Sequence, residues 1–386
     1  MTALTAITGA RIFDGNLWHD DSALLVEGGK VAAIAALRDV PADARIVPMD
    51  GLSLVPGFID LQVNGGGGVL LNERHDVEGI RTMCAAHARF GTTGLLPTLI
   101  TDNREVTAKT IAAGLAAREA GVPGFLGLHL EGPHLSIARK GAHDPSLIRP
   151  MEQADLERTV AARKGLDTLL MTLAPENATN EQIAALHAAG VTVSLGHSDS
   201  SYATAAAAVE AGAHMMTHLF NAMSQLGNRE PGMVGAALDL GHVNAGLIAD
   251  GYHVHPVAIR AALRAKRGPG RIFLVTDAMS PIGTDMTSFF LNGREIFREG
   301  GRLTLADGTL AGADIDMASC VRYMRNTVGI DLAEALRMAS LYPAEAIGLT
   351  GRKGRLTHGH DADFAVIDDG VNVLSTWIGG IPVFNA

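Results

Sequence analysis

Two histidines stand where short apolar runs of the chain end. His197 follows the run VTVSLG, and His218 follows the run AHMMT. An apolar run that stops at a histidine predicts a buried strand with a polar side chain at its tip. Glu131 and Asp277 close two further runs, FLGLHL and RIFLVT, in the same manner. Each carboxylate requires a partner there, because an unpaired buried charge is costly.

One glutamate and two histidines form a ligand set that suits Zn²⁺ or Fe²⁺ and leaves one position open for water. A metal held by Glu131, His197 and His218 would lower the pKa of that water to about 7. Asp277 would then be free to accept a proton and deliver it to a leaving group. Taken singly, each histidine is more readily a core or surface residue, and Asp277 could cap a helical turn. The combined pattern favours a catalytic metal site.

Parallel strands must bring these side chains together at their carboxyl ends. The middle of the chain alternates short apolar segments with Ala-rich helical segments over about 250 residues, which is typical of a TIM barrel. The eight expected strands span residues 58–63, 92–99, 125–131, 168–174, 191–197, 213–218, 245–250 and 271–277. A doubly wound open sheet is the alternative fold, but no phosphate loop of the form G-x-G-x-x-G follows the first strand.

Both ends of the chain contain short β-rich segments separated by Gly and Asp turns. We expect residues 1–54 and 352–386 to form together a small β-sandwich domain, with residues 55–351 as the barrel. A chain of 386 residues exceeds the ~250–300 residues at which a single core usually stops growing.

Charge and composition limit the partners that this chain is expected to bind. Its 31 basic and 41 acidic residues give a net charge of −10 without a basic cluster, so nucleic acid and anionic membranes are poor partners. No apolar stretch reaches the ~18 residues of a transmembrane helix. Two distant cysteines, Cys84 and Cys320, and the lack of a secretory signal favour a reducing, cytoplasmic location.

Nine motifs occur in order along essentially the whole chain. They are PGFIDLQVNG (55–64), LGLHLEGPHL (126–135), KGAHDP (140–145), SLGHSD (194–199), THLFNAM (217–223), REPG (229–232), ADGYHV (249–254), VTDAM (275–279) and LAGA (310–313). In these motifs the sequence resembles the amidohydrolase superfamily, and more closely its N-acetylglucosamine-6-phosphate deacetylase family.

The resemblance implies a metal held by Glu131, His197 and His218, with Asp277 as the catalytic acid and base. It implies that His143 polarises the acetyl carbonyl, as an oxyanion donor would. It assigns the sugar phosphate to Ala142, His143, Asn221, Ala222, Arg229, His253, Leu310, Ala311 and Gly312. The implied reaction converts N-acetyl-D-glucosamine 6-phosphate to D-glucosamine 6-phosphate and acetate in amino-sugar catabolism.

Arg229 suits a phosphate dianion because a guanidinium pairs with it through two hydrogen bonds. Without the resemblance, a surface pair with Glu230 would explain this arginine equally well. The resemblance further implies a homodimer in which Arg229 reaches the site of the neighbouring subunit.

Two features depart from the pattern of the superfamily. Many amidohydrolases have His-x-His at the end of the first strand and bind two metals, whereas this chain has Gln62 and Asn64 there. Because an amide is a poor ligand beside imidazole, we expect one metal ion per chain. Residues 227–228 are Gly-Asn, where relatives often have His-His. The open alternatives are another amidohydrolase, acting on a cyclic amide or an N-acetyl-amino acid, and a catalytically inactive barrel that serves as a binding protein.

Overall fold

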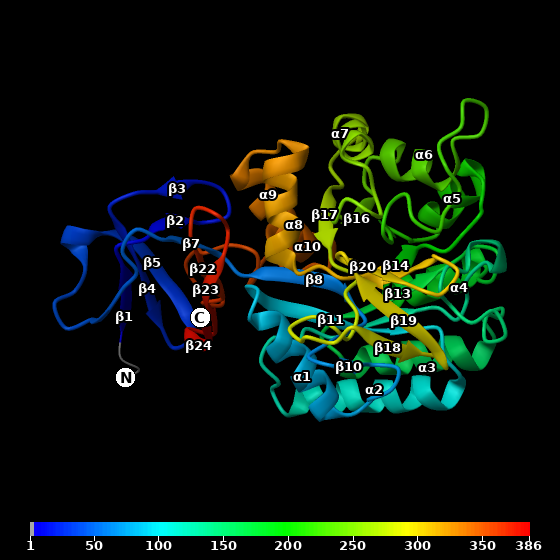
Figure 1. Ribbon diagram of the computed structural model, residues 1–386, viewed down its shortest axis with the longest axis horizontal. Coiled ribbons are helices and arrows are strands. Elements are labelled where there is room, and N and C mark those ends of the chain that lie inside the picture. Colours follow the sequence, from blue (N-terminus) through cyan, green and yellow to red (C-terminus); the bar gives the residue numbers. More distant parts are fainter. Residues whose placement is uncertain (1–3) are drawn as a thin grey trace.

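The computed structural model describes residues 4–386. Two parts lie side by side: a β-rich part built from both ends of the chain, and a larger barrel covered by helices (Figure 1). Among these residues, no helix has both the length and the apolar character needed to cross a bilayer.

The barrel sheet contains eight parallel strands in the order of the sequence. They are β8 (Phe58–Val63), β11 (Thr92–Ile100), β12 (Leu128–Glu131), β13 (Leu169–Leu173), β14 (Thr192–Leu195), β15 (Met215–Met216), β16 (Asn244–Ile248) and β17 (Ile272–Val275). A doubly wound sheet would reverse its strand order at a switch point, and this sheet does not. The structure therefore confirms the TIM barrel and excludes the open-sheet alternative.

Polar contacts between β8 and the residues directly after β17 close the barrel. The buried Asp60 carboxylate accepts a hydrogen bond from Thr276 Oγ1 at 2.5 Å and from the Thr276 backbone N–H at 3.2 Å. The Asp277 N–H donates to the Gln62 carbonyl at 2.9 Å. Burial raises the pKa of Asp60 to about 7, although its hydrogen bonds oppose this shift. Asp60 thereby fixes the ends of the first and last strands, which bear Gln62 and Asp277.

Within residues 4–386, ten α-helices cover the barrel or follow its last strand. They are α1 (Val77–Ala88), α2 (Arg104–Glu119), α3 (Gln153–Gly165), α4 (Asn180–Ala188), α5 (Tyr202–Glu210), α6 (Gly232–Asp239), α7 (Pro256–Ala265), α8 (Met317–Tyr323), α9 (Leu332–Ala339) and α10 (Leu341–Ala346). Side chains that accept backbone N–H groups begin several of them, as Asp76, Asn103 and Ser201 do. These caps end the loops that leave the carboxyl ends of the strands.

Two sheets form the β-rich part, and one of them combines both ends of the chain. The first sheet contains β1 (Thr5–Thr8), β4 (Ser22–Glu27), β5 (Lys30–Ala36) and β6 (Arg45–Pro48). The second contains β2 (Arg11–Phe13), β3 (Trp18–His19), β7 (Ser53–Pro56), β22 (Phe364–Ile367), β23 (Val373–Ile378) and β24 (Ile381–Asn385). Ile7 and Leu24 of the first sheet share a core with Phe364 and Trp377 of the second. The structure confirms the β-sandwich from both termini.

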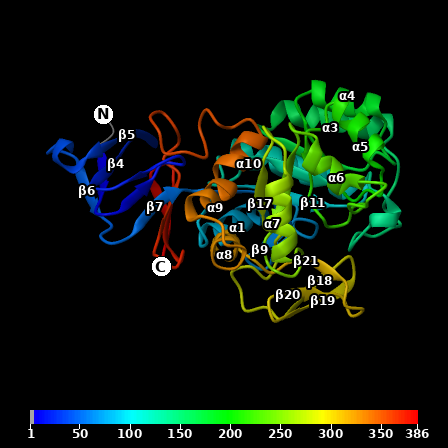
Figure 2. The ribbon, with the colours of Figure 1, turned by 90° about the horizontal axis from the view of Figure 1, so that it is seen from above.

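A further antiparallel sheet follows β17 and lies to one side of the barrel (Figure 2). Its strands are β18 (Ser288–Leu291), β19 (Arg294–Glu299), β20 (Arg302–Thr304) and β21 (Leu310–Ala313). Its apolar face packs Phe289 and Leu291 near Ile100 and Met279 at the carboxyl end of the barrel. This sheet was not expected from the sequence, and it brings residues 310–313 to the strand tips.

Candidate active site

A cavity of about 270 Å³ opens at the carboxyl ends of the barrel strands. Apart from Arg229, every residue expected in the site lines it: Glu131, Ala142, His143, His197, His218, Asn221, Ala222, His253, Asp277, Leu310, Ala311 and Gly312. Asn64, Ile100, Met279 and Leu291 also contribute to the wall. The cavity therefore combines a polar floor with an apolar side.

The backbone bends sharply where three of these side chains leave their strands. His197, His218 and Asp277 have φ values of 47°, 27° and 53°. L-residues rarely adopt this left-handed region, and such strain costs on the order of 1–3 kcal/mol per residue. The strain clusters around one cavity, as it does at functional sites.

Three side-chain atoms converge in the floor of the cavity. Glu131 Oε1 lies 3.4 Å from His197 Nε2 and 3.2 Å from His218 Nε2, and the two Nε2 atoms are 3.0 Å apart. In a tetrahedral site with bonds of 2.0–2.1 Å, ligand atoms lie about 3.3 Å from one another. The separations therefore fit one divalent transition metal.

Hydrogen bonding defines the tautomer of His197. Its Nδ1 lies 2.8 Å from the Arg139 carbonyl, which can only accept, so Nδ1 carries the proton. In the neutral ring, Nε2 then presents its lone pair to the cavity floor, as a ligand must. Burial by itself would raise the pKa of Glu131, but hydrogen bonds and charge from His197 and His218 hold that pKa well below its usual range.

His143 also approaches the floor, but its hydrogen bonding differs from that of a ligand. Its Nε2 lies 3.9 Å from Glu131 Oε2, and the donor atoms of Glu131, His143 and His197 all lie within 4.8 Å of one another. The Thr101 backbone N–H points to Nδ1 of His143 at 3.3 Å. A backbone N–H can only donate, so Nδ1 bears the lone pair and Nε2 carries the proton toward the cavity. His143 is thus arranged as a hydrogen-bond donor.

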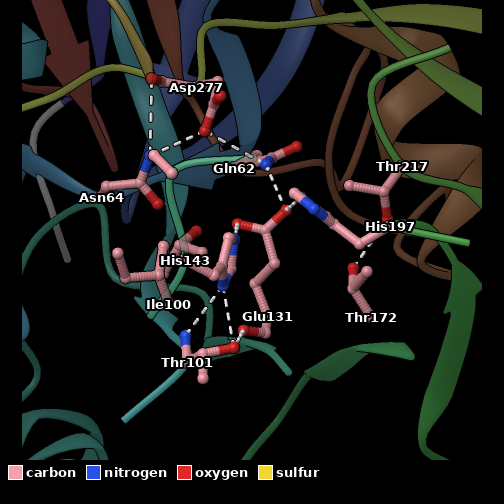
Figure 3. Close-up of polar contacts among 12 residues, drawn as sticks. Gln62, Asn64, Ile100, Thr101, Glu131, His143, Thr172, His197, Thr217 and Asp277 are labelled. Carbon is pink, nitrogen blue, oxygen red and sulfur yellow. Dashed lines mark hydrogen bonds and ion pairs between the residues drawn. The ribbon is translucent and has the colours of Figure 1, made fainter. Parts of the chain in front are cut away.

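Asp277 lies near Glu131, and Gln62 connects the two carboxylates (Figure 3). Its Oδ1 accepts from Asn64 Nδ2 at 2.6 Å and from Gln62 Nε2 at 3.1 Å, and Gln62 Nε2 also donates to Glu131 Oε1 at 2.9 Å. Burial, with the nearby Glu131 charge, raises the pKa of Asp277 to about 6. A carboxyl group with such a pKa suits proton transfer near neutrality. Gln62 and Asn64 therefore orient two carboxylates.

Other polar residues near the strand tips occupy supporting positions. Asp250, at the end of the seventh expected strand, accepts from His253 Nδ1 at 2.6 Å and so orients that ring at the cavity wall. His129 is buried between the hydroxyls of Thr98 and Thr172, at 3.3 Å and 2.8 Å. His129 thus packs inside the barrel, two residues before Glu131 on β12.

Two contacts with residues that line the cavity were not predicted from the sequence. Thr101 Oγ1 lies 2.8 Å from His143 Nδ1, and Arg294 donates to the Ala142 carbonyl. Thr101 directly follows β11, so the rule that found the other strand tips would have found it had the strand been extended by two residues. Arg294 belongs to the added sheet, and no local pattern marked it.

Arg229 is exposed and lies outside the lining of the cavity. The structure does not bring it together with the other expected residues within one chain. Of the residues 4–386, the cavity lining includes no lysine or arginine.

Comparisons with known proteins place the chain in a family. Residues 53–383 match the Amidohydrolase family. An N-acetylgalactosamine-6-phosphate deacetylase of Shewanella sp. (strain ANA-3) is 46% identical, over 98% of this chain and 95% of its own. An N-acetylglucosamine-6-phosphate deacetylase of Bos taurus is 39% identical, over 97% and 94%.

Solved structures agree with this placement. The N-acetylglucosamine-6-phosphate deacetylase of Pasteurella multocida aligns with a TM-score of 0.94 at 36% identity, over 98% of this chain and 99% of its own. A mutant of the Mycobacterium smegmatis enzyme in complex with N-acetyl-D-glucosamine 6-phosphate aligns at 0.91 and 30%, over 99% and 100%. A Xaa-Pro dipeptidase shares the fold alone, at 14% identity and 0.63. The chain belongs to the amidohydrolase family, among the N-acetylglucosamine- and N-acetylgalactosamine-6-phosphate deacetylases.

Proposed function

We propose that this protein hydrolyses N-acetyl-D-glucosamine 6-phosphate to D-glucosamine 6-phosphate and acetate, a step of amino-sugar catabolism. The observation that carries the proposal is the joint geometry of one cavity. Three ligand atoms converge within 3.4 Å, and a carboxylate and a histidine N–H that are not needed as ligands face the same space. Amide hydrolysis needs each of these components.

We further propose that Glu131, His197 and His218 hold one divalent transition metal, Zn²⁺ or Fe²⁺. When bound there, the metal would act as a Lewis acid toward water and the acetyl carbonyl. Gln62 favours one ion, because its Nε2 donates to Glu131 and Asp277 and an N–H donor is not a ligand.

The residues of this chain would then perform the proton transfers. Asp277 accepts a proton from the attacking water as the oxygen–carbon bond forms. It later donates this proton to the amide nitrogen as the carbon–nitrogen bond breaks, which releases acetate and the free amine. His143 donates its Nε2–H to the acetyl oxygen while negative charge develops there.

The sugar would occupy the wall formed by Asn221, Ala222, His253 and residues 310–312. The apolar side chains of Ile100, Met279 and Leu291 limit access of water to the rest of the cavity. Such a mixed wall is typical of sites for small polar ligands.

A second substrate has its own support. The relative from Shewanella, at 46% identity, is named for N-acetylgalactosamine 6-phosphate, which differs from the first substrate only in its configuration at C4. Acetate release should therefore be measured with both epimers, each with and without the 6-phosphate. We expect turnover of a phosphorylated hexosamine well above that of the free sugars. Equal turnover with and without phosphate would contradict the proposed substrate class.

The phosphate itself requires a cation that the cavity lining of one chain does not provide. We propose that Arg229 supplies it to the cavity of a neighbouring subunit in a homodimer. Arg229→Ala should weaken binding of the phosphorylated substrate by ~2–5 kcal/mol if the pair is buried, seen as a raised KM. The unphosphorylated sugar, which lacks the dianion, should be affected little.

Mixing variants tests whether Arg229 acts between subunits. Arg229→Ala chains are combined with Asp277→Asn chains under conditions that exchange subunits. If Arg229 acts in trans, one site of each mixed dimer regains an intact Asp277 and an intact Arg229, so activity at low substrate exceeds that of either parent. If Arg229 acts within its own chain, every site keeps one lesion and no recovery occurs.

The chain is divided into two domains, and its cysteines bear on its cellular location. We propose that residues 1–54 and 352–386 form the small domain; the pairing of β7 with β22 supports it. Lys353, which is buried and pairs with Asp361 at 2.9 Å and with Asp363, would anchor its second segment. Both cysteines are free and buried, which suits the reducing cytoplasm.

A further inference from the structure

Thr101 is the first residue after β11, and it lies between two groups of the active site. Its side chain is buried, with 1% exposure. Its Oγ1 lies 2.8 Å from Nδ1 of His143 and 3.3 Å from the backbone carbonyl of Glu131. A Cβ at Gly132 would approach Thr101 Oγ1 to 2.2 Å, so the turn after Glu131 packs directly against this hydroxyl.

The two donors of Thr101 act on the same nitrogen. The backbone N–H at 3.3 Å points to a lone pair on His143 Nδ1. The hydroxyl has one proton and two acceptors within reach, and it donates to Nδ1 at 2.8 Å rather than to the Glu131 carbonyl at 3.3 Å because Nδ1 is closer. The tautomer of a neutral histidine is fixed by the hydrogen bond that one ring nitrogen makes. With Nδ1 as the acceptor, the ring proton lies on Nε2, which faces the cavity.

The lone pair on Nδ1 also means that the ring is neutral, because both nitrogens of a charged imidazolium carry protons. The rings of His143 and His197 pack at a steep angle, with their centres 4.4 Å apart. A neutral ring that carries its proton on Nε2 donates to a carbonyl oxygen but offers no lone pair to a cation on that side.

We propose that Thr101 is a positioning residue that holds His143 as the Nε2–H tautomer. It thereby makes His143 a donor to the acetyl oxygen rather than a metal ligand. The expected effect on kcat rests on the proposed deacetylase function. The tautomer of His143 does not depend on that function.

Two substitutions at this position separate the hydroxyl from the bulk of the side chain. Thr101→Val keeps the shape and the backbone N–H but removes the hydroxyl, whereas Thr101→Ser keeps the hydroxyl. The matched control is Thr110→Val on α2, a buried threonine whose hydroxyl has no partner among the described residues. We expect kcat to fall about 10-fold in Thr101→Val, with KM within about twofold and metal content unchanged. Thr101→Ser should restore most of kcat, and Thr110→Val should match the wild type.

The tautomer is read directly by ¹⁵N NMR of the zinc-loaded protein with labelled histidine, and His143→Asn assigns the signal. We expect a protonated Nε2 and an unprotonated Nδ1 in the wild type and in Thr101→Ser, with a mixture of tautomers in Thr101→Val. A wild-type His143 protonated on Nδ1 would overturn the inference, and so would an unchanged kcat in Thr101→Val. If no hexosamine phosphate releases acetate, the proposed function fails, while the NMR result still decides the role of Thr101.

Discussion

Replacing Asp277 by Asn should lower kcat by at least ~10²-fold, the lower range for removing a general acid or base, while the protein keeps its metal. The amide retains the shape of the side chain and can still bond to Asn64 and Gln62 after rotation. It cannot accept a proton from water or return one to the leaving nitrogen. Metal analysis and acetate release measured on the same sample check both parts of this expectation.

The pH profile offers a second measure of the same group. Asp277 acts first as a base, so it must be ionised in the free enzyme. Its raised pKa of about 6 means that kcat/KM should be high above this pH and should fall as the pH drops through it. A bound metal, being positive, would move this acidic limb to lower pH, so we expect the limb at or below about pH 6.

A surface carboxylate provides the control. Asp239 at the end of α6 bonds to Tyr202 and Arg267 at the surface, and Asp239→Asn should leave kcat unchanged. Near-normal turnover of Asp277→Asn, with Asp239→Asn equally active, would show that proton transfer uses another group.

The barrel and the strand tips could be predicted from the sequence because their signals are local. A run such as RIFLV followed by Thr-Asp contains within seven residues both the apolar strand and the polar group at its end. All eight expected strands occur in the sheet, and the side chains at their tips line one cavity because parallel strands end on one face. Segment lengths were less predictable: the expected strand 213–218 contains only Met215–Met216 as β15.

Contacts between distant segments could not be predicted in this way. Arg294 reaches the Ala142 carbonyl across 152 positions of the chain, and nothing in the residues around either one indicates the pairing. The added sheet β18–β21 alternates buried and exposed residues like any surface hairpin, so the sequence does not say where it docks. The position of Arg229 outside the cavity likewise depends on contacts between distant segments, which the residues next to Arg229 do not indicate.

The identity of the third ligand illustrates what side-chain geometry adds to the sequence. His143 and His218 both approach Glu131, with their Nε2 atoms 3.9 Å and 3.2 Å from its oxygens. Proximity alone would allow either to complete a site with His197. Hydrogen bonding on the far side of the ring distinguishes them, because the Thr101 N–H donates to Nδ1 of His143, whereas Nδ1 of His218 has no partner among residues 4–386.

The choice of His218 rather than His143 as the third ligand predicts the largest loss of activity among the variants. Glu131→Ala and His218→Ala should each lose the metal and lower activity by at least ~10³-fold, since a Lewis acid contributes several kcal/mol. His143→Asn should retain about one metal ion per chain while its activity falls, because the imidazole there donates a proton to the acetyl oxygen rather than a lone pair to a cation. The metal content of each variant is measured after dialysis, on variants that unfold at the same temperature as the wild type. This measurement distinguishes a site that contains His218 from a site that contains His143. Loss of the metal from His143→Asn but not from His218→Ala would assign the third ligand to His143. About two metal ions per chain, with one lost in Gln62→Ala, would refute the mononuclear site.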